Sequence, residues 1–133
     1  MGDSTPASNP KLWYEASCHC GTVKYRINLP DLSSHQVNSC NCSVCTKNGY
    51  LLVYPKPTEV EWHQGYEMLK SYEFGHKRVT HRFCGNCGSS ILIDFHDGEK
   101  LGVNVRMLRD IEVDKLNFRY FDGKHKLGPE YEV

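Results

Sequence analysis

The sequence has 133 residues, with 16 Lys and Arg against 16 Asp and Glu. Its mass of 15.3 kDa is typical of one domain. A formal net charge of zero argues against a protein that binds phosphate backbones or anionic lipid, so we expect neither nucleic acid nor a membrane as partner. The longest apolar stretches, such as residues 50–54, are far shorter than the roughly 20 residues that a membrane-spanning helix needs.

The two ends of the chain differ from its middle. Residues 1–10 lack the apolar core of a signal peptide, and Pro6 stands where a myristoylation motif has Ser or Thr. We therefore expect a disordered lead-in over residues 1–11, one domain over 12–127 and a short tail over 128–133. The expected location is the cytoplasm, and the oligomeric state stays open, a homodimer included.

Short β-type segments follow one another along the whole domain. Residues 11–28 predict two strands joined at a cysteine-bearing turn, because Val23, Tyr25 and Ile27 fall on one face. Helical turns are expected just after Cys42 and around residues 110–116. Many short strands separated by Gly and Pro predict an all-β fold, an antiparallel β-sandwich or open barrel. The further β-type runs are 36–41, 50–54, 60–63, 68–74, 78–83, 90–95 and 101–107.

The cysteines are the most informative feature of the composition. Their number, seven, is odd, so they cannot all pair within one chain, and without a secretory signal we expect a reducing compartment. Metal binding explains their close spacing better than disulfides do. They are Cys18, Cys20, Cys40, Cys42, Cys45, Cys84 and Cys87.

Four of these cysteines form two half-sites, each followed by glycine: Cys18-His19-Cys20-Gly21 and Cys84-Gly85-Asn86-Cys87-Gly88. Together they supply the four sulfurs of a structural zinc site. Closing the 63-residue gap between Cys20 and Cys84 costs about 3–4 kcal/mol of chain entropy. A structural zinc contributes on the order of 10 kcal/mol or more. We therefore predict that a zinc ion joins the opening hairpin to a later one.

The other three cysteines, Cys40, Cys42 and Cys45, form a C-x-C-x-x-C run without a fourth. Three thiolates can hold a second zinc ion with one position open, as catalytic sites do. Alternatively, a histidine closes the shell, and His35, His81 and His96 are the candidates. The spacing alone does not decide between an open and a closed site.

The charge of an open three-sulfur site indicates its chemistry. Zn²⁺ with three thiolates carries a net charge near −1, which disfavours activation of water. Such an ion binds an incoming thiol well and keeps it deprotonated. The sequence thus predicts a substrate that carries sulfur, and a carbon–sulfur bond made or broken at that sulfur.

The three-part cysteine pattern resembles the family of glutathione-dependent formaldehyde-activating enzymes, which includes the domain of centromere protein V. The resemblance covers roughly residues 12–123, through C-x-C-G, C-x-C-x-x-C and R-F-C-x-x-C-G-S. It implies an Mss4-like all-β fold and two zinc ions per chain, one structural and one catalytic. It also implies carbon–sulfur lyase activity on a glutathione adduct, with glutathione or a conjugate as the small-molecule partner. Carried over by position, Cys18, Cys20, Cys84 and Cys87 hold the structural ion, and Cys40, Cys42 and Cys45 the catalytic one.

The second cluster departs from the usual family pattern at two positions. Members often carry His between its first two cysteines and Arg just after the last, where this chain has Asn41 and Thr46. The sequence therefore indicates the reaction class more firmly than the substrate, and bulkier thiol conjugates are equally compatible. Two other classes stay open: a non-enzymatic, zinc-stabilised module that binds a protein, and an iron–sulfur or metal-storage protein.

Overall fold

The computed structural model describes residues 11–127 except residue 76. The expected tail and nearly all of the expected lead-in lie outside the described residues. Lys11, assigned to the lead-in, instead begins the first strand. Within the described part of the chain, no helix is long and apolar enough to cross a membrane.

The smaller of the two sheets in the described chain contains β1 (Lys11–Ser17), β2 (Lys24–Pro30) and β5 (Val60–Gln64), paired antiparallel in the order β1-β2-β5. Tyr25, Ile27 and Leu29 alternate along β2 and are all buried, as a strand with one apolar face requires. The turn between β1 and β2 carries Cys18 and Cys20. The predicted hairpin with its cysteine-bearing turn is confirmed.

The larger sheet has the order β10-β3-β4-β9-β8-β7-β6. All of its neighbours are antiparallel except β10 and β3, which run parallel, with Phe121 opposite Cys40. This parallel pair was not expected from the sequence. The strands are β3 (Gln36–Cys40), β4 (Leu52–Val53), β6 (Leu69–Tyr72), β7 (Thr80–Cys84), β8 (Ser90–Asp94), β9 (Leu101–Asn104) and β10 (Asn117–Phe121).

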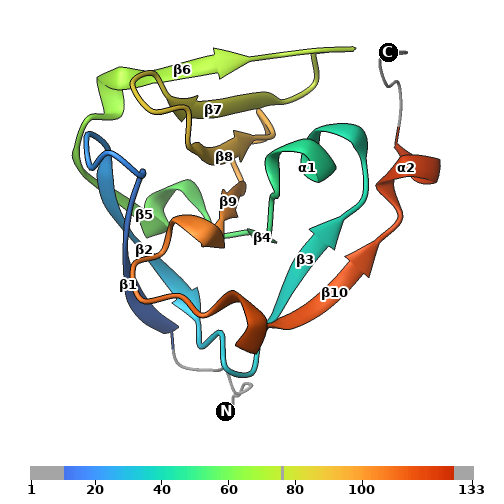
Figure 1. The fold of residues 1–133 in the computed structure, drawn as a ribbon, viewed down its shortest axis with the longest axis horizontal. Helices are drawn as coiled ribbons and strands as arrows, with labels where there is room; N and C mark the ends of the chain where they lie inside the picture. The colour runs from blue at the N-terminus through green and yellow to red at the C-terminus, as the bar shows by residue number, and fades with distance from the viewer. Residues whose placement is uncertain (1–10, 76, 128–133) are drawn as a thin grey trace.

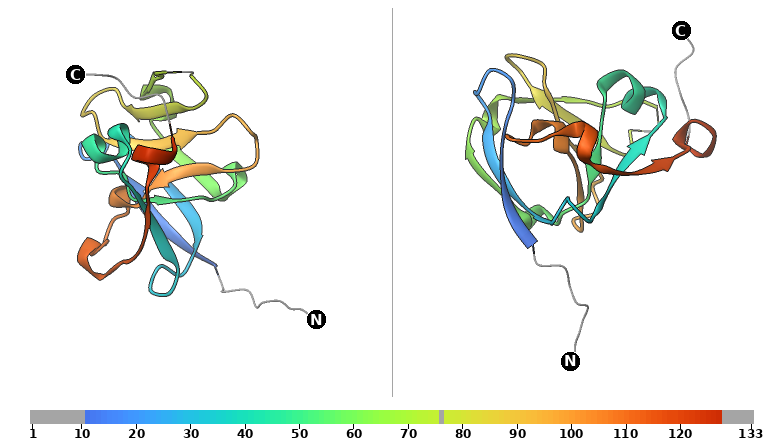
Figure 2. Two further views of the ribbon diagram at one scale, coloured as in Figure 1. Left: turned by 90° about the vertical axis from the view of Figure 1, so that its right-hand side faces the viewer. Right: turned by 60° about the horizontal axis from the view of Figure 1, so that its bottom comes forward.

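The two sheets face each other (Figures 1 and 2), and the larger of two apolar clusters in the described chain lies between them. Tyr25 and Ile27 enter it from the smaller sheet, and Val37, Ile91 and Val103 from the larger. Burying one such aliphatic side chain stabilises the fold by about 1.5–3 kcal/mol. The predicted all-β architecture of open sheets is confirmed.

Among the described residues, helical structure is limited to two short α-helices and four 3₁₀ turns. Helix α1 (Ser43–Asn48) begins directly after Cys42, as predicted, and ends at Gly49, whose φ of 65° suits glycine. Only a 3₁₀ turn, Val113–Lys115, occupies the region 110–116. Three further 3₁₀ turns cover Pro57–Glu59, Tyr66–Met68 and Val105–Met107. Helix α2 (Gly123–Lys126) follows β10 and was not predicted.

Candidate functional site

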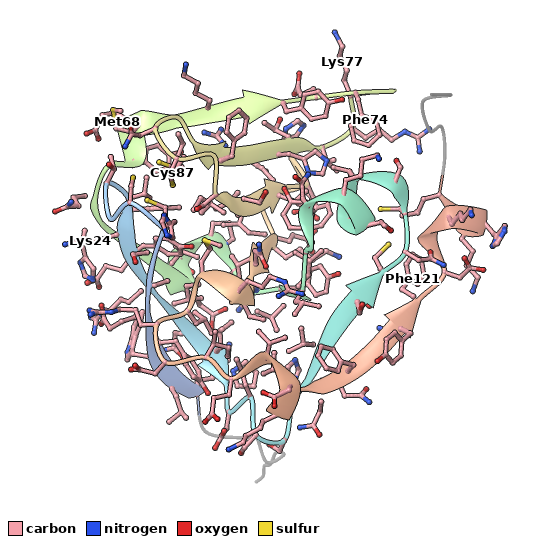
Figure 3. The ribbon with its side chains drawn as sticks, in the orientation of Figure 1. Lys24, Met68, Phe74, Lys77, Cys87 and Phe121 are labelled. Carbon is pink, nitrogen blue, oxygen red and sulfur yellow. The ribbon has the colours of Figure 1, made fainter. Side chains whose placement is uncertain are left out.

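The sulfur atoms gather in two places, one beside Cys87 and the other near Phe121 (Figure 3). The first group joins the β1–β2 turn to the β7–β8 turn: Cys18, Cys20, Cys84 and Cys87 have all four Sγ atoms within 4.8 Å of one another. The Sγ–Sγ distance is 3.6 Å for Cys18 and Cys20 and 3.9 Å for Cys20 and Cys84. Four sulfurs at the usual 2.3 Å from a tetrahedral zinc ion lie about 3.8 Å apart, so this geometry fits zinc.

Backbone amides surround the sulfurs of this first group. The Val23 amide donates to Cys18 Sγ at 3.3 Å, and the Asn86 amide donates to Cys84 Sγ at 3.4 Å. The side-chain amide of Asn86 also donates to Cys20 Sγ at 3.3 Å. Hydrogen bonds with Thr22 and Asn86 lower the pKa of Cys20 to about 7. These donors stabilise sulfur in the deprotonated form that binds metals.

The second group lies where β3 meets α1. Cys40 ends β3, Cys42 precedes α1 and Cys45 lies inside it, and their three Sγ atoms are within 4.8 Å of one another. The hydrogen bond with Cys45 lowers the pKa of Cys42 to about 6, whereas that same bond and burial raise the pKa of Cys45. Cys42 is therefore the thiol of this pair that loses its proton more easily, and a thiolate favours a cation.

The histidines that were candidates for closing this second group have other surroundings. His81 Nδ1 lies 3.3 Å from Tyr50 Oη, and His96 Nε2 lies 2.7 Å from Thr80 Oγ1. His35 lines a different cavity, between β2 and β3. Over residues 11–127 without residue 76, no His, Asp or Glu joins the three sulfurs as a fourth ligand.

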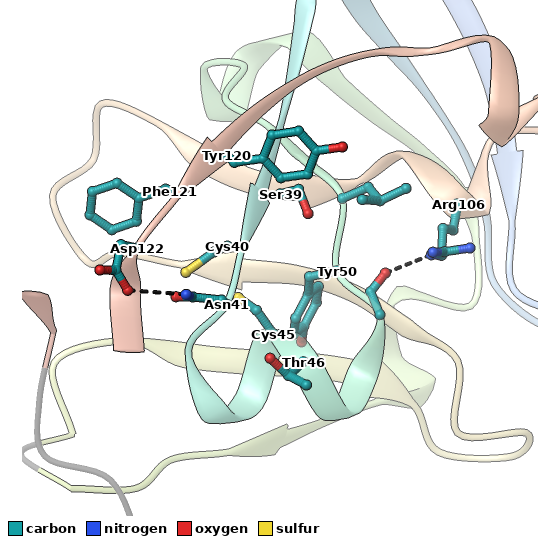
Figure 4. Close-up of a pocket in the computed structure, with 12 residues that line it drawn as sticks. Ser39, Cys40, Asn41, Cys45, Thr46, Tyr50, Arg106, Tyr120, Phe121 and Asp122 are labelled. Carbon is teal, nitrogen blue, oxygen red and sulfur yellow. Dashed lines mark hydrogen bonds between the residues drawn. The ribbon is translucent and has the colours of Figure 1, made fainter. Parts of the chain in front are cut away.

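The C-terminal segment holds the second cysteine group in place (Figure 4). The side chain of Asn41 donates to Asp122 Oδ1 at 3.0 Å and accepts from the Lys124 amide at 2.8 Å. A Cβ atom at Gly123 would lie only 2.5 Å from Cys40 Sγ. Sequence reasoning missed Asp122 and Gly123, because they come about 80 positions after Asn41 and Cys40, beside which they lie.

Two cavities meet at the second cysteine group, and Cys40, Cys45 and Phe121 line both. The smaller, of about 440 Å³, also contains Arg106 and Asp122 (Figure 4). The larger, of about 720 Å³, extends over β8 and the loop before β7. Cys40 and Cys45 are therefore reached from two sides, and Cys42 only from the larger cavity.

Residues 13–132 match the sequence profile of the glutathione-dependent formaldehyde-activating enzymes. The chain belongs to this family. The membership predicted from the cysteine pattern is thus confirmed over nearly the whole chain.

Two individual proteins are also similar to this chain. A Halomonas elongata protein provisionally named a glutathione-dependent formaldehyde-activating enzyme is 29% identical in an 87-residue alignment, and the match covers 59% of this chain. The match spans about half of that relative, 54% of its length. A crystal structure of a Rhodobacter sphaeroides protein superposes with a TM-score of 0.67 at 26% identity, covering 79% of this chain and 99% of the other.

The two sulfur groups are where metal can bind in this member of the glutathione-dependent formaldehyde-activating enzyme family. Each group has the donor type and spacing that suit a thiophilic ion such as zinc. The structure brings together each set of cysteines that the sequence assigned to one ion. Their roles as ligands, and the catalytic role of the second set, remain predictions.

Proposed function

We propose that this chain is a zinc-dependent carbon–sulfur lyase that acts on adducts of glutathione or a similar thiol. The observation that carries the proposal is the three-sulfur group of Cys40, Cys42 and Cys45. It lacks a fourth protein ligand among the described residues and lies between two cavities. An open position with substrate access on both sides suits catalysis rather than a purely structural site.

The residues of the site have separable tasks in this proposal. Cys40, Cys42 and Cys45 hold the catalytic zinc, and Cys18, Cys20, Cys84 and Cys87 hold the structural one. A zinc ion bound to three thiolates has room for a fourth ligand and keeps a bound thiol deprotonated. In the smaller cavity, Arg106 and Asp122 supply one charge of each sign, which complements the carboxylate and ammonium groups of glutathione.

The reaction that follows is a non-oxidative cleavage. In an S-hydroxymethyl adduct, the carbon–sulfur bond breaks and its electron pair leaves with sulfur as a thiolate. The hydroxyl group loses its proton and becomes the carbonyl of the released aldehyde. The same step in reverse forms the adduct. We place the chemistry within the domain 12–127 and expect it to operate in the cytoplasm.

Two matched substitutions test this division of labour. We expect Cys45→Ser to remain folded with no turnover of S-hydroxymethylglutathione. Cys87→Ser should lose the fold, because it removes a sulfur that joins two distant turns. Circular dichroism, zinc content and aldehyde release distinguish the two variants. Full activity in Cys45→Ser would contradict the proposal, and a zinc-loaded wild type without turnover would favour the non-enzymatic module.

A further inference from the structure

The larger cavity beside the second cysteine group has an apolar wall. Its volume is about 720 Å³, and residues of α1, β8, β10 and the loop that precedes β7 line it. Cavities of roughly 300–1,000 Å³ with such walls enclose drug-sized organic ligands. The apolar side chains that form its wall are Phe74, Val79, Ile93, Phe95, Phe121 and Leu127.

This volume exceeds what a one-carbon adduct occupies. A hydroxymethyl group adds one carbon and one oxygen to the sulfur, so it leaves the aromatic wall without contacts. A phenyl-sized group would instead pack against Phe95 and Val79 and remove apolar surface from water. The shape of the cavity thus favours a bulky, apolar substituent on the sulfur.

The charges at the mouth of the larger cavity restrict the kind of substituent further. Arg78, Lys100 and Arg119 line the exposed rim, against one carboxylate from Asp97. Lys100 Nζ also lies 5.7 Å from the centre of the Phe95 ring. A positively charged substituent would be repelled there, whereas a neutral or anionic one would not.

Two residues that line this cavity, His81 and Asn38, each have a buried polar atom without a hydrogen-bond partner among the described residues, Nε2 and Oδ1 respectively. His81 is only 4% exposed, lines the cavity and has Nδ1 beside Tyr50 Oη. Its other nitrogen, Nε2, is buried and finds no hydrogen-bond partner among the described residues. A buried nitrogen of this kind is stabilised by a ligand hydroxyl. The hydroxyl group of a hemithioacetal is attached to the carbon next to sulfur, which places it near the cysteine group.

Resting on the lyase function proposed above, we infer that the preferred substrates are hemithioacetals of glutathione with aromatic or similarly bulky apolar aldehydes. The aromatic group lies in the larger cavity and the tripeptide in the smaller, with the sulfur between them at the cysteine group. Cleavage releases the aromatic aldehyde and the thiol, with the same balance of bonds as for the formaldehyde adduct. Phe95 and Val79 then determine specificity.

Binding of stable thioethers tests the cavity without turnover. We expect the zinc-loaded protein to bind S-benzylglutathione at least about tenfold more tightly than S-methylglutathione, measured by calorimetry. Val79→Trp should fill the cavity and abolish that preference. Val113→Trp, a half-buried valine that lines none of the cavities described above, should retain it. Equal affinities in the wild type, or loss of the preference in both variants, would overturn the inference.

Rates of turnover for different adducts distinguish this inference from the lyase function on which it rests. We expect kcat/KM for the benzaldehyde adduct to exceed that for the formaldehyde adduct by about tenfold or more. Val79→Trp should lower only the former. A 4-carboxybenzaldehyde adduct should be cleaved at least as well as the neutral one, and a trimethylammonium analogue poorly. Cleavage of the formaldehyde adduct alone would overturn the inference and leave the lyase proposal intact, whereas no cleavage of any adduct would contradict both.

Discussion

Asn41 Nδ2 donates a hydrogen bond of 3.0 Å to Asp122 Oδ1, although 80 residues lie between the two in the chain. Asn41 stands between two cysteines of the second group, and Asp122 follows β10 directly. Because Asn41 also accepts a hydrogen bond from the Lys124 amide, one side chain connects the cysteine loop to the C-terminal segment. The geometry of the second cysteine group therefore depends on the docking of β10 and α2.

This contact can be followed through the ionisation of Asp122. Hydrogen bonds from Asn41 and then from His125 hold the pKa of Asp122 below its ordinary value of 3.8. With a pKa depressed in the folded state, the contact stabilises the fold above about pH 4, and this stabilisation is lost as the pH falls through the folded pKa. We expect Asn41→Ala to raise the pKa of Asp122, measured by NMR titration of the carboxyl carbon.

Asp31 provides an internal control for that titration. Its pKa is also lowered, but by the amide and hydroxyl of Ser33 within its own turn. It should therefore titrate identically in the wild type and in Asn41→Ala. An unchanged Asp122, or equal shifts of both carboxylates, would show that the Asn41–Asp122 contact is absent in solution.

Gly123 is predicted to be essential for the second metal site. Alanine favours a helix over glycine by about 1 kcal/mol, but a Cβ atom here would approach Cys40 Sγ to 2.5 Å and Cys42 Cβ to 3.1 Å. We expect Gly123→Ala to displace Cys40, reduce the zinc content from two ions per chain to one, and abolish turnover as Cys45→Ser does.

A second glycine gives the matched control for this substitution. Gly98 has a φ of 69°, and a Cβ atom there would meet nothing within 4 Å. Gly98→Ala should therefore lose only about 1 kcal/mol of stability through its backbone and keep both zinc ions. Two zinc ions in Gly123→Ala would contradict the packing argument.

The buried position of His81 predicts a pH-dependent stability. Burial lowers the pKa of His81 below its usual 6.5, so the unfolded chain takes up a proton that the folded chain does not. The free energy of unfolding should therefore fall as the pH drops below about 6.5, by at most about 1.4 kcal/mol per pH unit, until the folded pKa is reached.

The variant His81→Phe removes this titration while keeping a ring beside Phe74, which stacks on His81 at a centroid distance of 5.6 Å. Losing the contact with Tyr50 adds an offset that should vary little with pH. Urea unfolding at pH 7.5 and 5.5, with zinc present throughout, should give a smaller pH effect in the variant. If the free energy of unfolding changed equally with pH in both proteins, His81 would be charged, or solvated, in the fold.

Chelation should remove the two ions in separate steps. The four-sulfur group joins two turns and is surrounded by amide donors, whereas the three-sulfur group borders two cavities. A limiting amount of chelator should therefore extract one zinc with little change in circular dichroism, and excess chelator should extract the second with unfolding. Loss of both ions in a single step would mean that the two sites are not independent.

Apart from the meeting of the two distant cysteine half-sites, the features that the sequence predicted correctly are local ones. Alternating Val23, Tyr25 and Ile27 indicate β2, Gly after each cysteine pair indicates the turns, and the segment after Cys42 indicates α1. The pairing of β10 with β3 was not predictable in this way, because Asn117–Phe121 contributes only half-buried Phe118 and Phe121 and has its partner about 80 residues earlier. The larger cavity was equally unpredictable from the sequence, since Phe95, Val79 and Phe121 become neighbours only through the order of the strands in the sheet.

Cobalt substitution of the second site, followed by titration with glutathione, tests the proposed open position most directly. Cobalt in a sulfur-rich site reports its ligands through its visible absorption, and the Cys45→Ser protein provides the background from the four-sulfur site. We predict that glutathione shifts the cobalt spectrum of the wild type in a saturable manner, with no change in that background. A wild-type spectrum that does not respond to any concentration of thiol would contradict the proposal that this metal position is open to substrate.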